Sequence, residues 1–424
     1  MLPLKYIREN KDFVQDSLSK KQSKTDLAQL LDLDSQRRQY LQEVEQLRAE
    51  KNEVSNTIAE FKKAGKNAEV DIAAMRSVSD RIKAVESELR EVEDNIESTI
   101  YYIPNIVHSS VPVGKDESEN VTIREWGNKP KFSYQPKDHL QLGENLELFD
   151  FKRSVKMAGP GFPLYTGLGA KLERALINFM LDFHTENHGY VELFPPFLAN
   201  AKAMQNTGQL PKFEADMYRI PEDSLYCIPT AEVPVTNIHQ GEILSESDLP
   251  KKYAAYSACF RREAGSYGKE TKGLIRLHQF NKVELVKFVQ PDTSYDELES
   301  LLTDAEAILK KLELHYRVVE LCSGDLSFSA AKCYDLEVWS PADNKYLEVS
   351  SCSNFEDFQA RRSDIKYRSK STGKAQLLHT LNGSGVATPR LMVALLESCQ
   401  QADGSIKLPS ALHPYMNIKR IPTQ

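Results

Sequence analysis

Residues 258–286 read ACFRREAGSYGKETKGLIRLHQFNKVELV, and this stretch decides the fold. Its apolar ends predict two strands, and its basic, glycine-rich middle predicts the loop that joins them. Side chains two residues apart share a strand face, so we expect Arg261 and Glu263 on one face of the first strand. Phe280 and Glu284 should share a face of the second. Arginine suits a phosphate and phenylalanine a stacked base, although a charged hairpin with one core aromatic would explain the same residues.

Strands dominate on both sides of this hairpin. Patterns typical of strands cover 190–194, 254–262, 277–289, 334–339 and 346–351, and patterns typical of helices cover 167–188, 293–314 and 388–402. Few helices separate the strands. The sequence therefore predicts an α+β fold with an antiparallel sheet flanked by helices, rather than a doubly wound parallel sheet.

Common nucleotide and zinc motifs are missing from the sequence. Neither G-x-x-x-x-G-K-[ST] nor a strand-borne G-x-G-x-x-G occurs, so neither a P-loop nor a Rossmann site is expected. His184 and His188 have the spacing of zinc ligands on a helix, but no glutamate follows His184, and two exposed histidines explain the pair better. The six scattered cysteines form no C-x-x-C pair. We expect no zinc and no disulfide framework.

The first 105 residues differ in texture, with one glycine and two prolines. From about 27 to 100, apolar residues recur at alternating spacings of three and four, which is typical of a coiled-coil seam. The stretch KAGKNA at 63–68 predicts the turn of an antiparallel helical hairpin with arms roughly 50 Å long. Such an arm projects, and it serves either dimerisation or reach toward an extended partner. The seam residues are Tyr40, Val44, Leu47, Val54, Ile58, Phe61, Met75, Val78, Ile82, Val85, Leu89, Val92 and Ile96.

Composition sets broad limits on function. The 424 residues carry 54 Lys and Arg against 61 Asp and Glu, a formal net charge of −7, which by itself disfavours a nucleic-acid partner. No stretch approaches the roughly 18 apolar residues of a membrane span, and the first residues do not resemble a secretory signal. Scattered cysteines fit a reducing compartment, so we expect a cytoplasmic protein without a membrane partner.

Three segments, taken in order, resemble the motifs of class II aminoacyl-tRNA synthetases. GYVELFPP at 189–196 is similar to motif 1, FRRE at 260–263 to motif 2, and GSGVATPR at 383–390 to motif 3. Longer strings are similar to the seryl-tRNA synthetase family of bacterial type, which also has an N-terminal helical hairpin. These strings are RREAGSYG (261–268), LIRLHQF (274–280), TAE (230–232), EVSS (348–351) and TLNGS (380–384).

This resemblance implies a division of labour along the chain. Residues 1–105 are implied to form a tRNA-binding domain with the coiled-coil arm, and residues 106–424 the catalytic domain. The implied activity is that of a serine--tRNA ligase: ATP and L-serine form seryl-adenylate and pyrophosphate, and seryl passes to the terminal adenosine of tRNA(Ser). The implied assembly is a homodimer in which the arm reaches tRNA on the other subunit. Serylation of tRNA(Sec) is implied for cells that contain it.

The resemblance also implies roles for individual residues. Arg261 is implied to bind the α-phosphate and Arg390 the γ-phosphate, with Glu348 completing the catalytic set. Adenine is implied to stack between Phe280 and Arg390, with its amino group on Glu263. Glu348 and Ser351 are the implied Mg²⁺ ligands. The implied ATP-binding residues are Arg261, Arg262, Glu263, Phe280, Glu348, Val349, Ser350, Ser351 and Arg390; the implied serine-binding residues are Thr230, Ala231, Glu232, Arg261, Glu284, Asn382 and Ser384.

Three questions stay open at this level. The predicted loop residues Arg262, Lys269 and Lys272 either contact the tRNA acceptor end or are simply solvated. The chain could instead be a synthetase-like ligase that charges a carrier protein. It could also be an inactive RNA-binding paralogue, although the complete set of Arg261 and Arg390 with their acidic partners argues against that.

Overall fold

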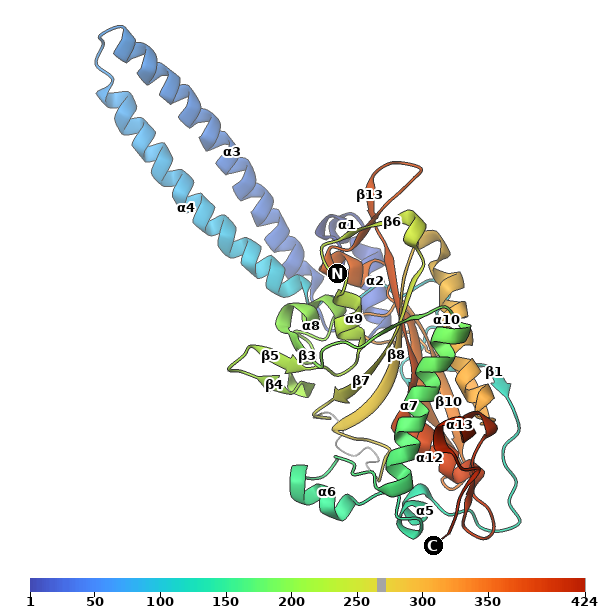
Figure 1. Cartoon of the computed structure of the whole chain (residues 1–424). Coiled ribbons are helices and arrows are strands. Elements are labelled where there is room, and N and C mark those ends of the chain that lie inside the picture. Colours follow the sequence, from blue (N-terminus) through green and yellow to red (C-terminus); the bar gives the residue numbers. More distant parts are fainter. Residues whose placement is uncertain (265–271, 424) are drawn as a thin grey trace. The chain divides into compact units, whose positions relative to one another are not determined.

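The computed structural model describes residues 1–264 and 272–423 and divides the chain into two compact units. The smaller unit consists of Leu2–Ser19 and Ser23–Pro104, and the larger one of Met1, Lys20–Gln22 and Asn105–Gln424. Figure 1 shows both units coloured along the sequence. Among the described residues, no helix combines the length and apolar character needed to cross a membrane.

The smaller unit is built from helices, and its two long ones form the predicted hairpin (Figure 1). Gly65 has a φ of +67°, a left-handed conformation that glycine adopts at no steric cost, and it lies in the turn between them. The predicted turn is therefore confirmed. The helices are α1 (Leu4–Glu9), α2 (Lys11–Lys20), α3 (Leu27–Lys63) and α4 (Glu69–Ile100).

The predicted coiled-coil seam faces the partner helix of the hairpin. Seven of its members are buried: Val44, Ile58, Val78, Ile82, Val85, Val92 and Ile96. The other six are half-buried, and none is exposed. Alternating spacings of three and four therefore identified the packed face of both helices.

In the larger unit, the largest sheet found among the described residues has eight strands. Neighbouring strands are antiparallel, except for the parallel pair of β2 with β7. The predicted antiparallel α+β fold is confirmed. In spatial order the strands are β1 (Val121–Trp126), β9 (Tyr316–Glu320), β10 (Lys332–Ser340), β11 (Lys345–Asn354), β14 (His379–Ala387), β8 (Gln279–Val289), β7 (Lys251–Phe260) and β2 (Val191–Leu193).

Helices and three small sheets complete the larger unit. The helices are α5 (His139–Asn145), α6 (Phe151–Ala158), α7 (Gly167–Asn187), α8 (Ala201–Thr207), α9 (Glu232–Asn237), α10 (Ser294–Lys311), α11 (Phe358–Ser363), α12 (Thr388–Cys399) and α13 (His413–Met416). The small sheets contain β3 (Leu198–Asn200), β5 (Leu225–Cys227) and β4 (Arg219–Ile220); β6 (Ile243–Ser245), β12 (Lys366–Arg368) and β13 (Ala375–Leu377); and β15 (Ile406–Lys407) with β16 (Arg420–Ile421).

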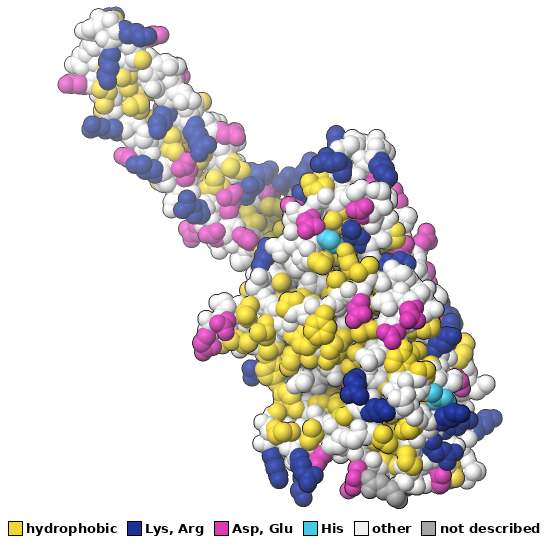
Figure 2. All heavy atoms as spheres, in the orientation of Figure 1, with side chains coloured by type: hydrophobic (Ala, Val, Ile, Leu, Met, Phe, Trp, Pro, Cys, Tyr) yellow, Lys and Arg dark blue, Asp and Glu magenta, His cyan; other side chains and the backbone are white. Residues whose placement is uncertain are grey.

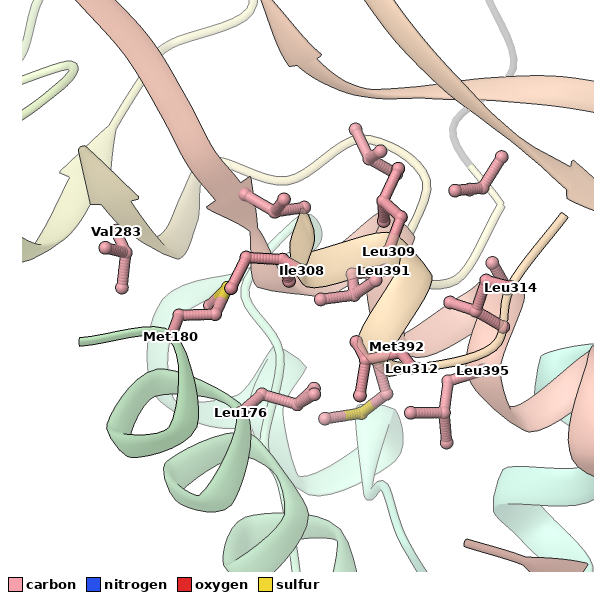
Figure 3. Close-up of a cluster of buried hydrophobic side chains, with 14 of the residues drawn as sticks. Leu176, Met180, Val283, Ile308, Leu309, Leu312, Leu314, Leu391, Met392 and Leu395 are labelled. Atoms are coloured by element: carbon pink, nitrogen blue, oxygen red, sulfur yellow. The ribbon is translucent and has the colours of Figure 1, made fainter. Parts of the chain in front are cut away.

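One face of the large sheet packs on α7, α10 and α12, and the first half of β8 turns polar side chains to the other face. On β8, Val283 and Leu285 are fully buried in a core that α7, α10 and α12 complete. Figure 3 shows part of this core, where Val283 lies near Met180 of α7, and Ile308 of α10 lies beside Leu391 of α12. Strand alternation turns Phe280, Lys282 and Glu284 toward the opposite face.

Two local expectations were wrong. Strand β7 ends at Phe260, so Arg261 and Glu263 do not share a strand face; they lie in the segment that follows, where Glu263 has a φ of +53°. His184 is not exposed but fully buried, with Nδ1 3.0 Å from Nδ1 of His188. Gly385 lets the sheet approach closely, since a Cβ there would lie 3.1 Å from His184 Nε2.

Candidate active site

A hollow of about 390 Å³ in the larger unit gathers most of the predicted site residues. They come from loops, from β8, β11 and β14, and from the start of α12, so the cavity draws together segments far apart in sequence. The predicted residues that line it are Thr230, Glu232, Arg261, Glu263, Phe280, Glu348, Val349, Ser351, Asn382, Ser384 and Arg390.

Arg261 is aimed at the cavity by the end of the β7–β8 hairpin. Its backbone N–H donates to the carbonyl of His278 at 2.9 Å, which continues the strand pairing for one residue. Its guanidinium lies 5.2 Å from the centre of the Phe280 ring, a cation–π contact. Glu263 is paired with Arg276, whose Nη1 is 2.6 Å from Oε2. A cation, an aromatic face and a carboxylate therefore meet at one end of the cavity.

Buried carboxylates mark a second region of the cavity. Glu284 is fully buried and accepts hydrogen bonds from Thr230 Oγ1 at 2.8 Å and Asn382 Nδ2 at 3.2 Å. It also forms an ion pair with Lys282. Thr230, Lys282 and Asn382 line the cavity, so Glu284 fixes the polar groups that a ligand would meet. A buried charge with several partners in this way is costly to leave incomplete.

Glu232 is buried close to the Glu284 carboxylate. Gln359 Nε2 donates to its Oε1 at 2.7 Å, and Thr380 Oγ1 in turn donates to Gln359 Oε1 at 2.8 Å. Burial, reinforced by the Glu284 carboxylate, raises the pKa of Glu232 to about 7. Two adjacent carboxylates in a low-dielectric site would attract a cationic group such as an ammonium.

Arg390 and Glu348 both line the cavity and contact each other there. Arg390 Nη1 donates to the Glu348 carbonyl at 2.9 Å, and its Nε donates to the carbonyl of Ile275 at 3.2 Å. Asp335 lies opposite Ser351 in the pairing of β10 with β11. Burial raises the pKa of Asp335 well above its ordinary value, and the Glu348 carboxylate adds to the shift.

These groups fit a divalent cation. Glu348, Asp335 and Ser351 are hard oxygen donors, and Mg²⁺ is usually held by one or two carboxylates together with phosphates and water. The mutual repulsion of two carboxylates is what a cation relieves. The sequence analysis did not predict Asp335. Strand alternation in Tyr334-Asp-Leu-Glu-Val puts Asp335 on the same face as Glu337. In the structure Glu337 pairs with Glu348, and Asp335 pairs with Ser351.

Four of the predicted site residues do not line the cavity. Glu284 acts through Thr230 and Asn382, as described above. Ala231 is buried among apolar side chains, and Ser350 Oγ donates to the Ser384 carbonyl at 2.5 Å. Arg262 is exposed, with its guanidinium 5.6 Å from the Tyr218 ring centre. Direct ligand contact by these residues stays a prediction.

Two cationic residues at the cavity were missed by the sequence analysis. Arg276 and Lys282 both line it, and each is paired with a predicted site residue, Glu263 or Glu284. The sequence offered one signal for them: Arg276 lies two residues before His278, and Lys282 lies two residues after the predicted site residue Phe280. Of the loop cations, Lys272 pairs with Asp138. Lys269 lies outside the described residues.

An antiparallel sheet that holds such a cavity, with a motif-3 helix starting at its edge, defines the class II aminoacyl-tRNA synthetase fold. Residues 212–399 match the family model of the tRNA synthetase class II core domain (G, H, P, S and T), and residues 1–107 match that of the seryl-tRNA synthetase N-terminal domain. The chain belongs to the serine--tRNA ligase family.

Full-length relatives support this assignment. A serine--tRNA ligase of Syntrophobacter fumaroxidans is 53% identical over 422 residues, 99% of this chain and 100% of that protein. One of Chloroherpeton thalassium is 55% identical over 428 residues, again 99% and 100%. The crystal structure of seryl-tRNA synthetase from Pyrococcus horikoshii complexed with ATP has a TM-score of 0.94 at 37% identity, and covers all of both chains.

A second solved structure agrees. Cytoplasmic serine-tRNA ligase from Naegleria fowleri in complex with AMP has a TM-score of 0.89 at 27% identity, over 100% of this chain and 99% of that one. Neither of the two alternatives, a carrier-protein ligase or an inactive RNA-binding paralogue, is supported by these similarities.

Proposed function

We propose that the chain activates L-serine with ATP and transfers the seryl group to the 3′-terminal adenosine of tRNA(Ser). The observation that carries the proposal is one cavity in which an arginine–aromatic site adjoins the buried Glu232 and the polar groups held by the buried Glu284. The first suits a nucleotide and the second suits an amino acid. Full-length similarity to serine--tRNA ligases supports the same reaction.

Activation requires positioning and charge stabilisation rather than a general base, because the serine carboxylate itself attacks the α-phosphorus. In this proposal Arg261 binds the α-phosphate and Arg390 the γ-phosphate. Adenine stacks between Phe280 and Arg390, and its amino group donates to Glu263. ATP therefore has to displace the pairs of Arg390 with Glu348 and of Glu263 with Arg276.

When bound, Mg²⁺ would supply positive charge that neutralises the phosphates of ATP. Glu348 and Ser351 are the proposed ligands, and Asp335 adds negative charge beside them. The hydroxyl of Ser351 lies 3.0 Å from Cys333 Sγ, and the side chain also hydrogen-bonds the Asp335 carboxyl.

Serine recognition is assigned to the buried carboxylates. Glu232 and Glu284 would accept from the ammonium and the hydroxyl, with Thr230, Asn382 and Ser384 completing the site. Alanine would leave these buried polar groups without a partner, which costs on the order of 10⁴-fold in specificity. Threonine can satisfy them and has to be excluded by the lack of room for its methyl group.

We assign tRNA binding to residues 1–105, with catalysis in residues 106–424. The arm would contact the long variable arm of tRNA(Ser) through backbone and shape, which requires a local basic surface and not a basic protein. The proposal includes tRNA(Sec) in cells that contain it, because the same variable arm would be read. A cytoplasmic location is proposed because the described structure has six free cysteines and no disulfide.

We propose a homodimer formed through α7 and β2. Val191 is 58% exposed and Phe194 77% exposed, and Phe194 lines a depression of about 430 Å³ together with residues of α7 and with Glu192 of β2. Figure 2 shows hydrophobic side chains gathered over this part of the larger unit, around β3 and β7. An exposed apolar patch of this kind is typical of a surface that another chain covers.

The test is ATP–pyrophosphate exchange with each amino acid, followed by aminoacylation of total tRNA. Serine-dependent exchange and charging of tRNA(Ser) are expected. Exchange without tRNA charging would favour a carrier-protein ligase, and the absence of serine-dependent exchange would refute the proposal. Sedimentation of the purified protein measures the oligomeric state.

A further inference from the structure

A buried carboxyl group behind the cavity has hydrogen-bond partners on one of its two oxygens, and the structure shows none for the other among the described residues. Glu173 lies on α7 and is 5% exposed. Its Oε1 accepts from Asn281 Nδ2 at 2.8 Å and also from Thr388 Oγ1. Its Oε2 is buried and has no hydrogen-bond partner among the described residues. A half-satisfied buried carboxyl is costly, so its retention calls for an explanation beyond packing.

The two donors are neighbours of the proposed adenine site. Asn281 follows Phe280 on β8, and because adjacent strand residues face opposite sides, Glu173 holds the strand from behind the cavity. Thr388 begins α12, two residues before Arg390. The same Thr388 hydroxyl reaches the Asn281 carbonyl at 3.1 Å. One carboxyl oxygen therefore ties the strand that carries Phe280 to the helix start that carries Arg390.

We propose that Glu173 is a positioning residue for ATP: it sets the separation of Phe280 and Arg390 through its bonds to Asn281 and Thr388. The inference rests on the proposed placement of adenine between Phe280 and Arg390. A slot between two planar groups is sensitive to its width, because stacking contacts weaken within fractions of an ångström. Glu173 touches neither substrate, and its effect reaches ATP only through those two bonds.

The carboxyl can also make ATP binding depend on pH. Burial raises the pKa of Glu173 to about 7. An ionised carboxylate accepts stronger hydrogen bonds than a neutral carboxyl, so the link between β8 and α12 is tighter above about pH 7. The titratable and charged groups that face it are Arg174 on its own helix, Tyr165 before that helix, Tyr256 of β7 and Glu192 of β2. Tyr165 and Tyr256 stay neutral between pH 6 and 8, because burial raises the pKa of both.

The test compares Glu173→Ala, Glu173→Gln and Thr388→Val in serine-dependent ATP–pyrophosphate exchange of the full chain from pH 6 to 8. Glu173→Ala should raise the KM for ATP about tenfold, with the KM for serine within about twofold of wild type. Glu173→Gln keeps a neutral hydrogen-bond acceptor, so its KM for ATP should equal that of wild type at pH 6. Between pH 6 and pH 8 the KM for ATP of wild type should fall, whereas that of Glu173→Gln should not show this fall. Titration of ATP itself is common to both enzymes and cancels in their ratio.

Glu222→Gln is the control, since Glu222 is an exposed glutamate that lines neither the cavity nor the depression; its ATP kinetics should match wild type. Thr388→Val removes one of the two bonds to Glu173, together with the Thr388 bond to the Asn281 carbonyl. It should raise the KM for ATP about threefold or more, which decides the matter if Glu173→Ala does not fold. An unchanged KM for ATP in Glu173→Ala would overturn the inference. Equal rises of the KM for ATP and the KM for serine in Glu173→Ala would also overturn the inference. So would a KM for ATP that depends on pH in the same way in Glu173→Gln and wild type. Absence of exchange in wild type would instead refute the proposed function.

Discussion

Arg390 and Glu348 form an ion pair in the wall of the cavity, with Arg390 Nη1 3.2 Å from Glu348 Oε2 and 2.9 Å from the Glu348 carbonyl oxygen. The two side chains are 26% and 48% exposed, so the pair contributes little to stability. It holds the guanidinium near the place proposed for the γ-phosphate at little energetic cost. In the proposed reaction, the arginine would exchange this partner for a phosphate of ATP and the carboxylate would exchange it for Mg²⁺.

Glu348→Gln should therefore weaken metal use while leaving the fold intact. Loss of a carboxylate ligand is expected to raise the Mg²⁺ concentration for half-maximal pyrophosphate exchange by about 10- to 100-fold. Thermal unfolding should be nearly unchanged, because the pair is exposed. Asp343→Asn is the control: Asp343 lies in the turn between β10 and β11 and pairs with Lys345, outside the cavity. An unchanged Mg²⁺ dependence in Glu348→Gln would remove Glu348 from the metal site.

Arg261→Ala should abolish adenylate formation without disturbing the proposed dimer. Removing one charge-stabilising donor typically costs about 10²- to 10³-fold in rate, and Arg261 also covers the Phe280 ring. Pyrophosphate exchange measures the loss, and sedimentation measures the dimer. Arg219→Ala is a matched control at an exposed arginine that does not line the cavity. Near-normal exchange in Arg261→Ala would contradict the proposed role.

Local periodicity in the sequence predicted the hairpin and the main strands because it reflects a packed face. Val44 and Val85 are buried in the seam that their spacing indicated. Periodicity could not predict the left-handed conformation of Glu263, which ends the strand pattern two residues early. It also could not show that His184 is buried, since this depends on the close approach of Gly385 from a strand 200 residues away.

The site required information beyond local pattern. The hydrogen bonds of Thr230 and Asn382 to Glu284 join three segments that are separated by 54 and 98 residues along the chain. No spacing rule connects such positions, so the family resemblance supplied them. Lys282 and Arg276 were missed for another reason. Both lie within residues 258–286, but a lone cation in or beside a strand usually lies on a solvated face.

Serine binding should release protons below about pH 7. The pKa of Glu232 is raised to about 7, so the carboxyl is largely neutral at pH 6 in the ligand-free protein. A bound ammonium favours the ionised form and lowers this pKa, so the KM for serine should rise as pH falls through 7. Calorimetry at pH 6 in buffers of different ionisation enthalpy measures the released proton.

Glu232→Gln is the variant that isolates this proton. It should remove the proton release and raise the KM for serine on the order of 10- to 100-fold, because a charge-assisted hydrogen bond is lost. Glu242→Gln, at an exposed glutamate that bonds His239 outside the cavity, should bind serine with the same proton release as wild type. Equal proton release in Glu232→Gln and wild type would show that another group titrates.

The arm contains two populations of cations, those paired across the hairpin and those without such a pair. Three arginines bond a glutamate of the opposite helix: Arg37 with Glu93, Arg48 with Glu86 and Arg81 with Glu43, at 2.7–2.9 Å. Five exposed cations closer to the turn have no ion pair among the described residues: Lys51, Lys62, Lys63, Lys66 and Arg76. Figure 2 shows basic side chains at this end of the hairpin. We expect the second group to contact tRNA.

Reversing two of these charges should therefore affect charging and spare activation. Lys62→Glu with Lys63→Glu should raise the KM for tRNA about tenfold or more and reduce its salt dependence, with serine-dependent exchange unchanged. Arg48→Gln breaks an internal pair and should change the KM for tRNA by less than about twofold, since exposed pairs contribute little. Deleting residues 35–97 should likewise leave exchange intact and abolish most charging. Unchanged charging after the deletion would refute the reaching role, and equal effects of Arg48→Gln and the lysine reversals would refute the division into two populations.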